Sequence, residues 1–358
     1  MRLKGFRHFG GANPAVAALK KALAWQDVVA PHTGKAMTEA MLLGIGGGIG
    51  AGWRADADTG VAIGTRHGWC DDAVFLKAAC RRLGVLAMVK ETADPVSARR
   101  QLDETLQMGK AAICWVDAAA LPYGGRAANG DWVVLVYGHD VDGDAAWISD
   151  LARKGLAITA DELAAARAPA PKHRLLSVTP PRELRALSQA VTDGIRECAH
   201  GLFVELDSMI AAERALVDFD SPRGFLKTFP IGPAFVHALA CVYRSIMHFG
   251  NKGGALRSVY ADFLDEAATV LDRDTLHELA AHYRDAHTLW ADVAAAALPA
   301  KPAILAEARA LIDEREDVLF AQGKNARQAL AAIADKERAL AERAAAKAPV
   351  TDKAARRI

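Results

Sequence analysis

The stretch WVVLVYGHDVDGDAAWISD, residues 132–150, decides the fold of this chain. Its first half, residues 132–140, is dense in valine and predicts a buried strand. Asp142-Gly143 is a hairpin turn signal, and residues 145–150 are predicted to return as the partner strand. The stretch therefore predicts an antiparallel pair of strands at the centre of a sheet.

Around this hairpin, helix and strand signals alternate through the first half of the chain. Further strands are predicted at residues 85–89, 111–117 and 174–180, and helices at residues 14–25, 38–43, 72–83, 97–108 and 159–167. Thr159 and Glu162 have the spacing of a capping box, and Gly84 and Gly109 are placed to end helices.

From Glu183 onward the chain changes to alanine- and leucine-rich amphipathic segments. They predict five or six helices, the last two forming a hairpin around Gly323. The fold class is therefore α+β: a domain with a central antiparallel sheet at residues 1–181, an all-α domain at 182–348, and a frayed tail at 349–358. Pro180-Pro181 marks the boundary.

The composition and charge of the chain argue against several classes of partner and cofactor. The chain has 358 residues, 44 Lys plus Arg against 43 Asp plus Glu, and a net charge of +1, which argues against nucleic acid as a partner. No apolar stretch is long enough for a membrane span, so no membrane partner is expected. Five cysteines with no C-x-x-C pair predict neither a disulfide framework nor a zinc site. We expect a cytoplasmic protein with no metal and no cofactor.

The glycine run GIGGGIGAG, residues 44–52, resembles a phosphate-binding loop in composition. A dinucleotide fingerprint follows a strand and opens a helix, whereas this run follows a predicted helix. We therefore interpret it as a tight buried turn that packs against the helix at residues 14–25.

Three polar clusters offer ligand chemistry, each with a simpler alternative. His67 and Cys70 precede Asp71 and Asp72, which are well placed to start a helix. The second cluster consists of His139, Asp140, Asp142 and Asp144, where turn chemistry explains the carboxylates. The third consists of His248, Lys252 and Arg257 around a glycine loop, an anion site or a capped helix break. Cys70 with His67 remains a weak alternative nucleophile pair.

The order of segments resembles a known family. TEAMLLGIGGGIG, KAAICWVDAAALPY, the hairpin at 132–150 and ITADELAAAR together resemble the N-terminal domain of the butirosin-biosynthesis H protein family. MHFGNKGGALRSVYADFLDEAATVL and AAHYRDAHTLWADVAAAAL resemble the helical domain of unknown function that commonly follows it. The resemblance implies a papain-like fold and transfer of an aminoacyl-type group from an acyl carrier protein to an aminoglycoside.

In that family pattern a cysteine opens the first helix, a histidine starts a central strand and an acid ends the next strand. Here the corresponding positions hold Asn13-Pro14 and Trp132, and only Asp150 is retained. An alternative register places His8 and Phe9 before the helix, again without a thiol. The resemblance thus implies a cleft lined by Asn13, Trp132, Asp150 and Tyr123, with no nucleophile to activate.

Three hypotheses follow from these residues. The first is a catalytically degenerate protein that binds a small molecule or carrier-linked acyl group in the biosynthesis of a specialised metabolite. The second is an active acyltransferase or amidohydrolase with relocated residues, such as Cys70 with His67, or Asp150. The third is a structural role, with a homodimer formed through the helical domain. The missing thiol and imidazole argue against an enzyme.

Overall fold

The computed structural model describes residues 1–65, 71–123, 131–140, 142–217, 224–248, 251–321 and 326–355. The chain forms two compact units that interleave along the sequence. The first unit contains Met1–Gly48, Cys70–Cys198 and Val259–Ala281, and the second contains Ile49–Trp69, Ala199–Ser258 and His282–Ile358. The domain boundary predicted near Pro180-Pro181 concerns sequence domains rather than these units, and it stays a prediction.

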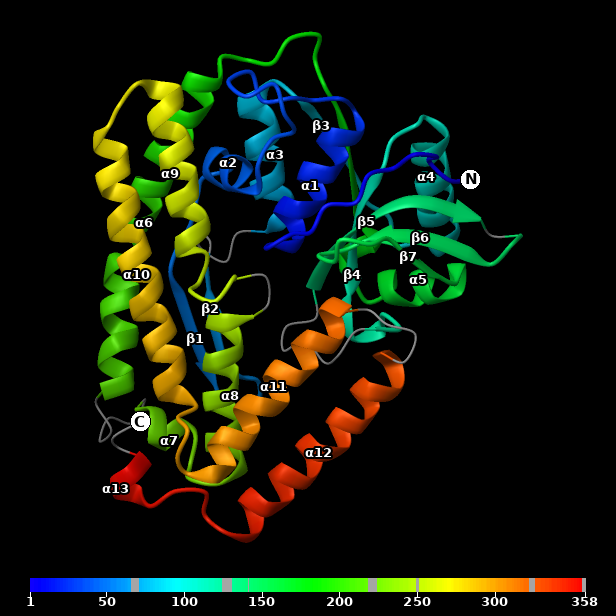
Figure 1. The fold of residues 1–358 in the computed structure, drawn as a ribbon. Coiled ribbons are helices and arrows are strands. Elements are labelled where there is room, and N and C mark those ends of the chain that lie inside the picture. Colours follow the sequence, from blue (N-terminus) through cyan, green and yellow to red (C-terminus); the bar gives the residue numbers. More distant parts are fainter. Residues whose placement is uncertain are drawn as a thin grey trace. The chain divides into compact units, whose positions relative to one another are not determined.

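A six-stranded antiparallel sheet organises the first unit (Figure 1). Its strands lie in the order β3-β8-β4-β5-β6-β7. Their bounds are β3 Leu86–Lys90, β4 Ala112–Asp117, β5 Asp131–Asp140, β6 Ala145–Ser149, β7 Leu156–Ile158 and β8 Leu175–Thr179. The antiparallel sheet confirms the predicted fold class of this half of the chain; β7 was not predicted.

The predicted hairpin is confirmed: it consists of the strands β5 and β6. Leu135 pairs with Ser149 and Val136 with Ile148, and the register shifts between Val136 and Gly138. Side chains along β5 are buried on both faces of the sheet, from Val133 to Val136. A continuous apolar run is what a strand covered on both faces requires, which explains why this segment lacks strict alternation.

Several helices of the first unit pack against the sheet. Figure 1 shows α1, α4 and α5 beside the strands of the sheet. Their bounds are α1 Pro14–Trp25, α3 Asp72–Leu83, α4 Pro95–Gln107 and α5 Ala160–Arg167, with short turns η2 Ala118–Ala120 and η3 Pro171–His173. The capping box of Thr159 and Glu162 is present, and Gly84 ends α3 in a left-handed conformation, as predicted.

The start of the glycine run forms a buried turn in the first unit, as predicted. It follows α2, Glu39–Ile45, and is buried as expected. A Cβ at Gly44 would lie 2.2 Å from the Phe263 ring and one at Gly46 2.4 Å from the Phe75 ring. These two glycines therefore accommodate aromatic rings of α3 and of α9, Arg257–Leu271. The predicted packing of the run against α1 stays a prediction.

Helices dominate the second unit, as the sequence predicts. Among the described residues the long helices of the second half are α6 Leu187–Val217, α8 Pro233–Met247, α9, α10 Thr275–Ala297, α11 Ala303–Ala321 and α12 Ala326–Ala346, joined by the short α7 Phe225–Thr228 and α13 Asp352–Ala355. A hairpin that was not predicted, β1 Gly52–Asp56 with β2 Gly60–Gly64, also belongs here. Its Val61 and Ile63 join a core built around Phe229 and Phe235.

The frayed tail predicted at residues 349–358 stays a prediction, although two of its described residues are buried. Val350 and Ala355 are both buried in the core of the second unit. Residues 352–355 form α13, and residues 356–358 lie outside the described part of the chain.

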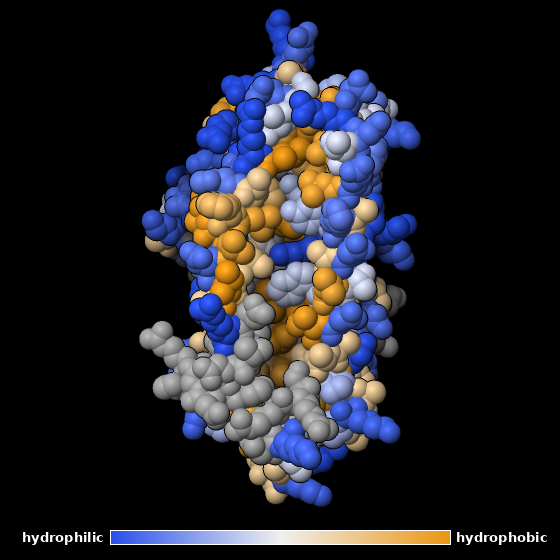
Figure 2. Space-filling view, turned by 90° about the vertical axis from the view of Figure 1, so that its left-hand side faces the viewer, coloured by the Kyte–Doolittle hydropathy of each residue, from blue (hydrophilic) through white to orange (hydrophobic). Residues whose placement is uncertain are grey.

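Large apolar side chains are exposed on two helices of the second unit. Figure 2 shows hydrophobic surface gathered on one face of the molecule. The most exposed large apolar residues of α6 and α10 in this unit are Phe203, Val204, Leu289 and Val293. No helix in the described ranges is long and apolar enough to cross a membrane. The homodimer expected through the helical domain stays a prediction.

A substitution at Gly194 tests the close packing of α2 against α6. A Cβ on Gly194 would lie 2.2 Å from the carbonyl oxygen of Gly44, a backbone atom that no rotamer change can move. We expect Gly194→Ala to destabilise the protein by about 1–3 kcal/mol despite the better helix propensity of alanine. Urea unfolding tests this, with Arg196→Ala on the exposed side of the same helix as the control. Equal stability of the two variants would contradict the close packing.

Candidate functional site

A buried carboxylate, that of Asp150, lies at the centre of a polar network in the first unit. The indole Nε1 of Trp132 donates to both carboxylate oxygens at 3.1 Å. The hydroxyl of Tyr123 donates to Oδ2 at 3.0 Å, and the backbone N–H of Leu151 donates to Oδ1 at 2.8 Å. Three donors thus converge on one side chain that is almost completely withdrawn from water.

The strand register brings Trp132 and Asp150 together. Because Leu135 pairs with Ser149, the next position along β6 lies opposite Val134. Trp132 is two residues from Val134 on the same face of β5, so it is the diagonal neighbour of Asp150. Diagonal neighbours are within reach of aromatic side chains. Tyr123 reaches the same carboxylate from the turn that follows η2.

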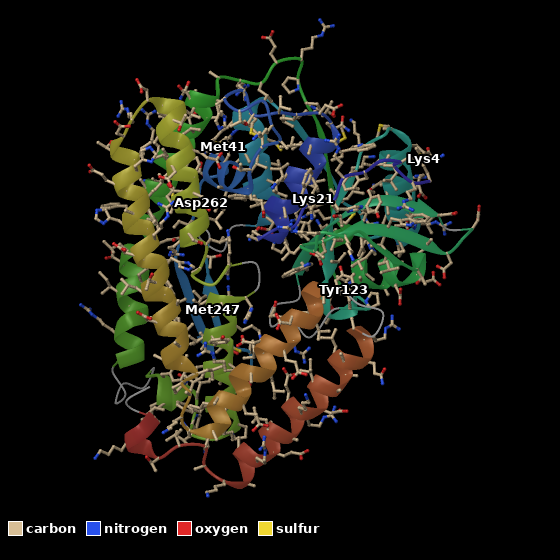
Figure 3. The ribbon with its side chains drawn as sticks, in the orientation of Figure 1. Lys4, Lys21, Met41, Tyr123, Met247 and Asp262 are labelled. Atoms are coloured by element: carbon tan, nitrogen blue, oxygen red, sulfur yellow. The ribbon has the colours of Figure 1, made fainter. Side chains whose placement is uncertain are left out.

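Lys21 completes the network from α1. Its ammonium group donates to the backbone carbonyl of Asp150, and its side chain is 1% exposed. Lys21 and Tyr123 are labelled in Figure 3. A lysine so deeply buried is unusual unless it is paired. Here the carbonyl of Asp150 supplies a hydrogen bond, and the carboxylate of the same residue supplies a nearby opposite charge.

Burial controls the protonation of these groups. It lowers the pKa of Lys21 from 10.5 to about 8, although the charges of Asp150 and Glu39 oppose the shift. It also raises the pKa of Asp150, against the hydrogen bonds from Trp132 and Tyr123. The pKa of Tyr123 lies well above its usual value, first through burial and then through the carboxylate beside it.

Asn13 and Pro14 form the start of α1. The side chain of Asn13 accepts a hydrogen bond from the N–H of Val16 at 3.2 Å, and Pro14 is the first helical residue. The carboxylate of Glu39 accepts from the N–H groups of Ala12 and Asn13 at 3.0–3.2 Å. The anion at this helix start is therefore the chain's own glutamate.

The structure thus brings together three of the four residues predicted to line the cleft: Trp132 and Tyr123 both donate to the carboxylate of Asp150. The fourth, Asn13, serves as a helix cap. His8, from the alternative register, has its Nδ1 3.2 Å from the hydroxyl of Ser149. His67 and Cys70 lie outside the described residues.

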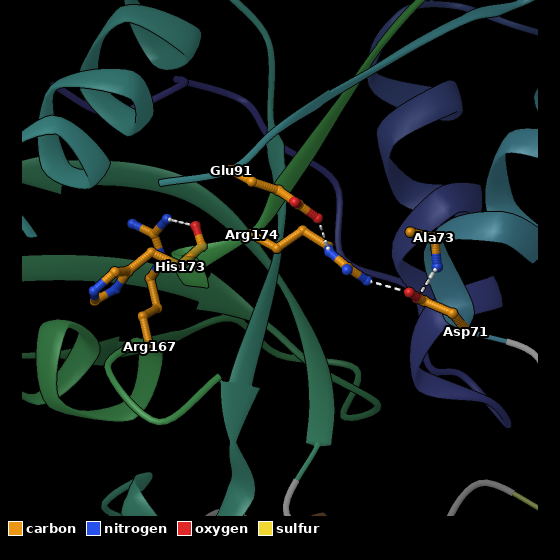
Figure 4. A network of polar contacts seen from close by, with 6 residues as sticks. All are labelled: Asp71, Ala73, Glu91, Arg167, His173 and Arg174. Atoms are coloured by element: carbon orange, nitrogen blue, oxygen red, sulfur yellow. Dashed lines mark hydrogen bonds and ion pairs between the residues drawn. The ribbon is translucent and has the colours of Figure 1, made fainter. Parts of the chain in front are cut away.

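The neighbours of the first polar cluster act as a helix start, as the simpler alternative predicts. Asp71 is the N-cap of α3 and accepts from the N–H of Ala73 at 2.8 Å. Arg174 bridges Asp71 and Glu91, and Figure 4 shows this bridge beside the pair formed by Arg167 and His173. The carboxylate of Asp71 is therefore engaged in structural contacts.

In the second cluster the described contacts are also structural. His139 contacts Asp103 at 2.7 Å. Asp140 accepts from the N–H of Gly143, and Asp144 accepts from that of Ala160 at the start of α5. The bond within the turn, from Gly143 to Asp140, fits the predicted turn chemistry.

The basic residues of the third cluster also have contacts within the chain. His248 lies 3.0 Å from Asp313, and Arg257 donates to the carbonyl groups of Ala255 and Gly50. In the described part of the chain, no group of three or more His, Cys, Asp or Glu side chains is placed to hold a metal ion.

Sequence reasoning missed Lys21 and Glu39. A signal for Lys21 was present, since it lies one helical turn after Ala17 and directly before Ala22 and Leu23 on the apolar side of α1. A charged residue at such a position indicates a buried partner. Glu39 gave no comparable signal, because its partners are backbone groups 26 and 27 residues away.

Comparison with known families gives two matches. The model described as "Butirosin biosynthesis protein H, N-terminal" matches residues 17–151, and "Domain of unknown function (DUF4872)" matches residues 161–344. The first match covers Lys21, Tyr123, Trp132 and Asp150 and begins after Pro14. No curated protein matches the chain.

Because the amine of Lys21 is buried, we expect the stability of the folded protein to depend on pH. The unfolded chain, with the ordinary lysine pKa of 10.5, binds more protons between pH 8 and 10.5 than the folded chain does. The stability of the wild type relative to Lys21→Met therefore rises by about 2–3 kcal/mol between pH 7 and pH 10. Urea unfolding of both proteins at these pH values measures the difference. A pH-independent difference would contradict a lowered pKa.

Proposed function

Because the chain belongs to the family that joins a butirosin biosynthesis protein H N-terminal domain to this domain of unknown function, we propose that it is a catalytically degenerate, acyltransferase-like protein. It binds a small molecule or a carrier-linked acyl group in the biosynthesis of a specialised metabolite. The papain-like fold and the acyl-transfer ancestry are parts of this proposal that rest on the family resemblance.

The hydrogen bond from Trp132 to Asp150 is the observation that carries the proposal. In the family pattern a histidine at this position would donate one N–H to the acid and use its second nitrogen as a base. An indole also donates, but it has no lone pair to accept a proton. Trp132 therefore reproduces the structural half of the histidine–acid contact and lacks the catalytic half.

The start of α1 supports the same conclusion. Pro14, at the position that the resemblance assigns to the cysteine, has neither a thiol nor a backbone N–H. Glu39 lies at this helix start and would disfavour a thiolate or an oxyanion there. Covalent acyl transfer by the family route needs both groups that these residues replace.

The indole ring of Trp132 can still contact a ligand. The side chains of Tyr123, Lys21 and Asp150 are buried, while Trp132 is only half-buried and so keeps aromatic surface for a ligand. An apolar acyl chain or a pantetheine arm would pack against this indole, whose N–H is held in place by the carboxylate.

We expect Trp132→Ala to abolish the thermal stabilisation that an acyl-pantetheine thioester gives the wild type, because the aromatic surface is lost. The wild type should bind the thioester without consuming it in the presence of an amine acceptor. Differential scanning fluorimetry and thiol release measure the two effects. Trp147→Ala, which removes a half-buried indole from the neighbouring strand β6, is the matched control.

An unchanged shift in Trp132→Ala, or one lost equally in Trp147→Ala, would contradict binding at Trp132. Thiol release by the wild type above the uncatalysed rate would contradict a degenerate site.

A further inference from the structure

The strand β3 forms one edge of the six-stranded sheet. Among the described residues β8 is its one neighbouring strand, with Leu86 opposite Thr179 and Lys90 opposite Leu175. In an antiparallel ladder, every second residue directs its N–H and C=O away from the strand that it pairs with. The outer side of β3 therefore offers a row of backbone donors and acceptors to another extended strand.

Large apolar side chains are exposed along this edge. Leu86 is 59% exposed and Met88 47% exposed, and they share a face of the strand because side chains alternate with a period of two. Lys90, the charged residue of β3, lies at its end and contacts Glu104 of α4 at 3.4 Å. Met108, which caps the end of α4, is also exposed. An open backbone edge with apolar side chains beside it is typical of a strand that pairs with a further strand.

The charges at the two ends of β3 are opposite in sign. Arg81 and Arg185 are exposed at its start, where the Arg185 side chain lies against Gly84. Glu91 and Asp94 are exposed just after its end. An antiparallel copy of the same strand would place the basic start of each strand beside the acidic end of the other, twice in a two-fold dimer. The charges thus favour a second copy of this chain as the occupant of the edge.

We propose that β3 is a dimer interface, at which it pairs antiparallel with β3 of a second copy around a two-fold axis at Met88. Met88 then lies opposite the partner's Met88, and Leu86 is its diagonal neighbour across the interface, within reach of the side chain. Leu86 itself lies opposite the partner's Lys90, whose aliphatic stem covers it. The two sheets become one continuous sheet, and both exposed edges are removed.

This interface is distinct from the two other surfaces of interest on the chain. The proposal does not depend on the proposed function, because Trp132 lies on β5 and Asp150 follows β6. It also differs from the homodimer predicted through the helical domain, for which the exposed apolar residues of α6 and α10 are the alternative surface. Those helices satisfy their backbone groups internally and present no open edge.

Sedimentation velocity over a range of concentrations tests the interface. We expect the full-length wild type to dimerise, and Met88→Glu to weaken dimerisation by at least about tenfold, because it removes apolar contact and sets two like charges opposite each other. Leu289→Glu, which changes a residue of α10 that is 65% exposed, is the matched control and should leave dimerisation unchanged. Circular dichroism checks that each variant is folded.

A cysteine cross-link at the axis tests the register. Directly opposite residues of an antiparallel pair have Cα atoms about 4.5–5.5 Å apart, within the span of a disulfide. Under mild oxidation we expect Met88→Cys to form a disulfide-linked dimer. Val96→Cys, at the exposed start of α4, and the wild type should not. Non-reducing electrophoresis measures the product.

Three results would overturn the proposal. The first is a wild type that stays monomeric up to about 100 μM, a concentration at which even weak dimers form. The second is a dimer that Leu289→Glu abolishes and Met88→Glu does not, which would assign dimerisation to the helical face. The third is a dimer in which Met88→Cys does not cross-link.

Discussion

The withdrawal of the Asp150 carboxylate from water is the constraint on which the rest of the first unit depends. A buried carboxylate is costly unless donors replace its hydration. Trp132 and Tyr123 supply two such donors, and Lys21 supplies a nearby positive charge. These groups meet only if the β5–β6 register, the turn after η2 and the position of α1 are all correct.

The same arrangement supports the proposal that family membership and catalysis separate in this chain. A histidine and a tryptophan can both hold an acid through an N–H, so the fold tolerates their exchange. Proton transfer requires the histidine, since only the imidazole has a second nitrogen with a lone pair. At the helix start, Pro14 occupies the position that the resemblance assigns to the thiol, and the carboxylate of Glu39 accepts from the N–H groups of Ala12 and Asn13. In the proposed function, the structural contacts of the family pattern survive and the catalytic ones do not.

Local signals predicted much of this fold because they are encoded within a few residues. The valine run of β5, the capping box of Thr159 and Glu162, and the left-handed Gly84 all correspond to what the structure contains. Long-range contacts were not accessible in this way. The contact between Gly44 of the glycine run and Phe263, some 200 residues later, had no local signal. The β1–β2 hairpin was missed because its core partners lie on α8, far along the chain. At the candidate site, Trp132, Tyr123 and Asp150 were found through the resemblance, while Lys21 was hidden among alanines and leucines.

The indole N–H of Trp132 offers the most direct test of the account. The chain has seven tryptophans, so the ¹H–¹⁵N spectrum has few indole signals, and Trp132→Phe assigns the relevant one. If Trp132 is bound to Asp150, this proton exchanges slowly with solvent in the wild type and much faster in Asp150→Ala. An indole proton that exchanges in the wild type as rapidly as that of free tryptophan would contradict the central claim.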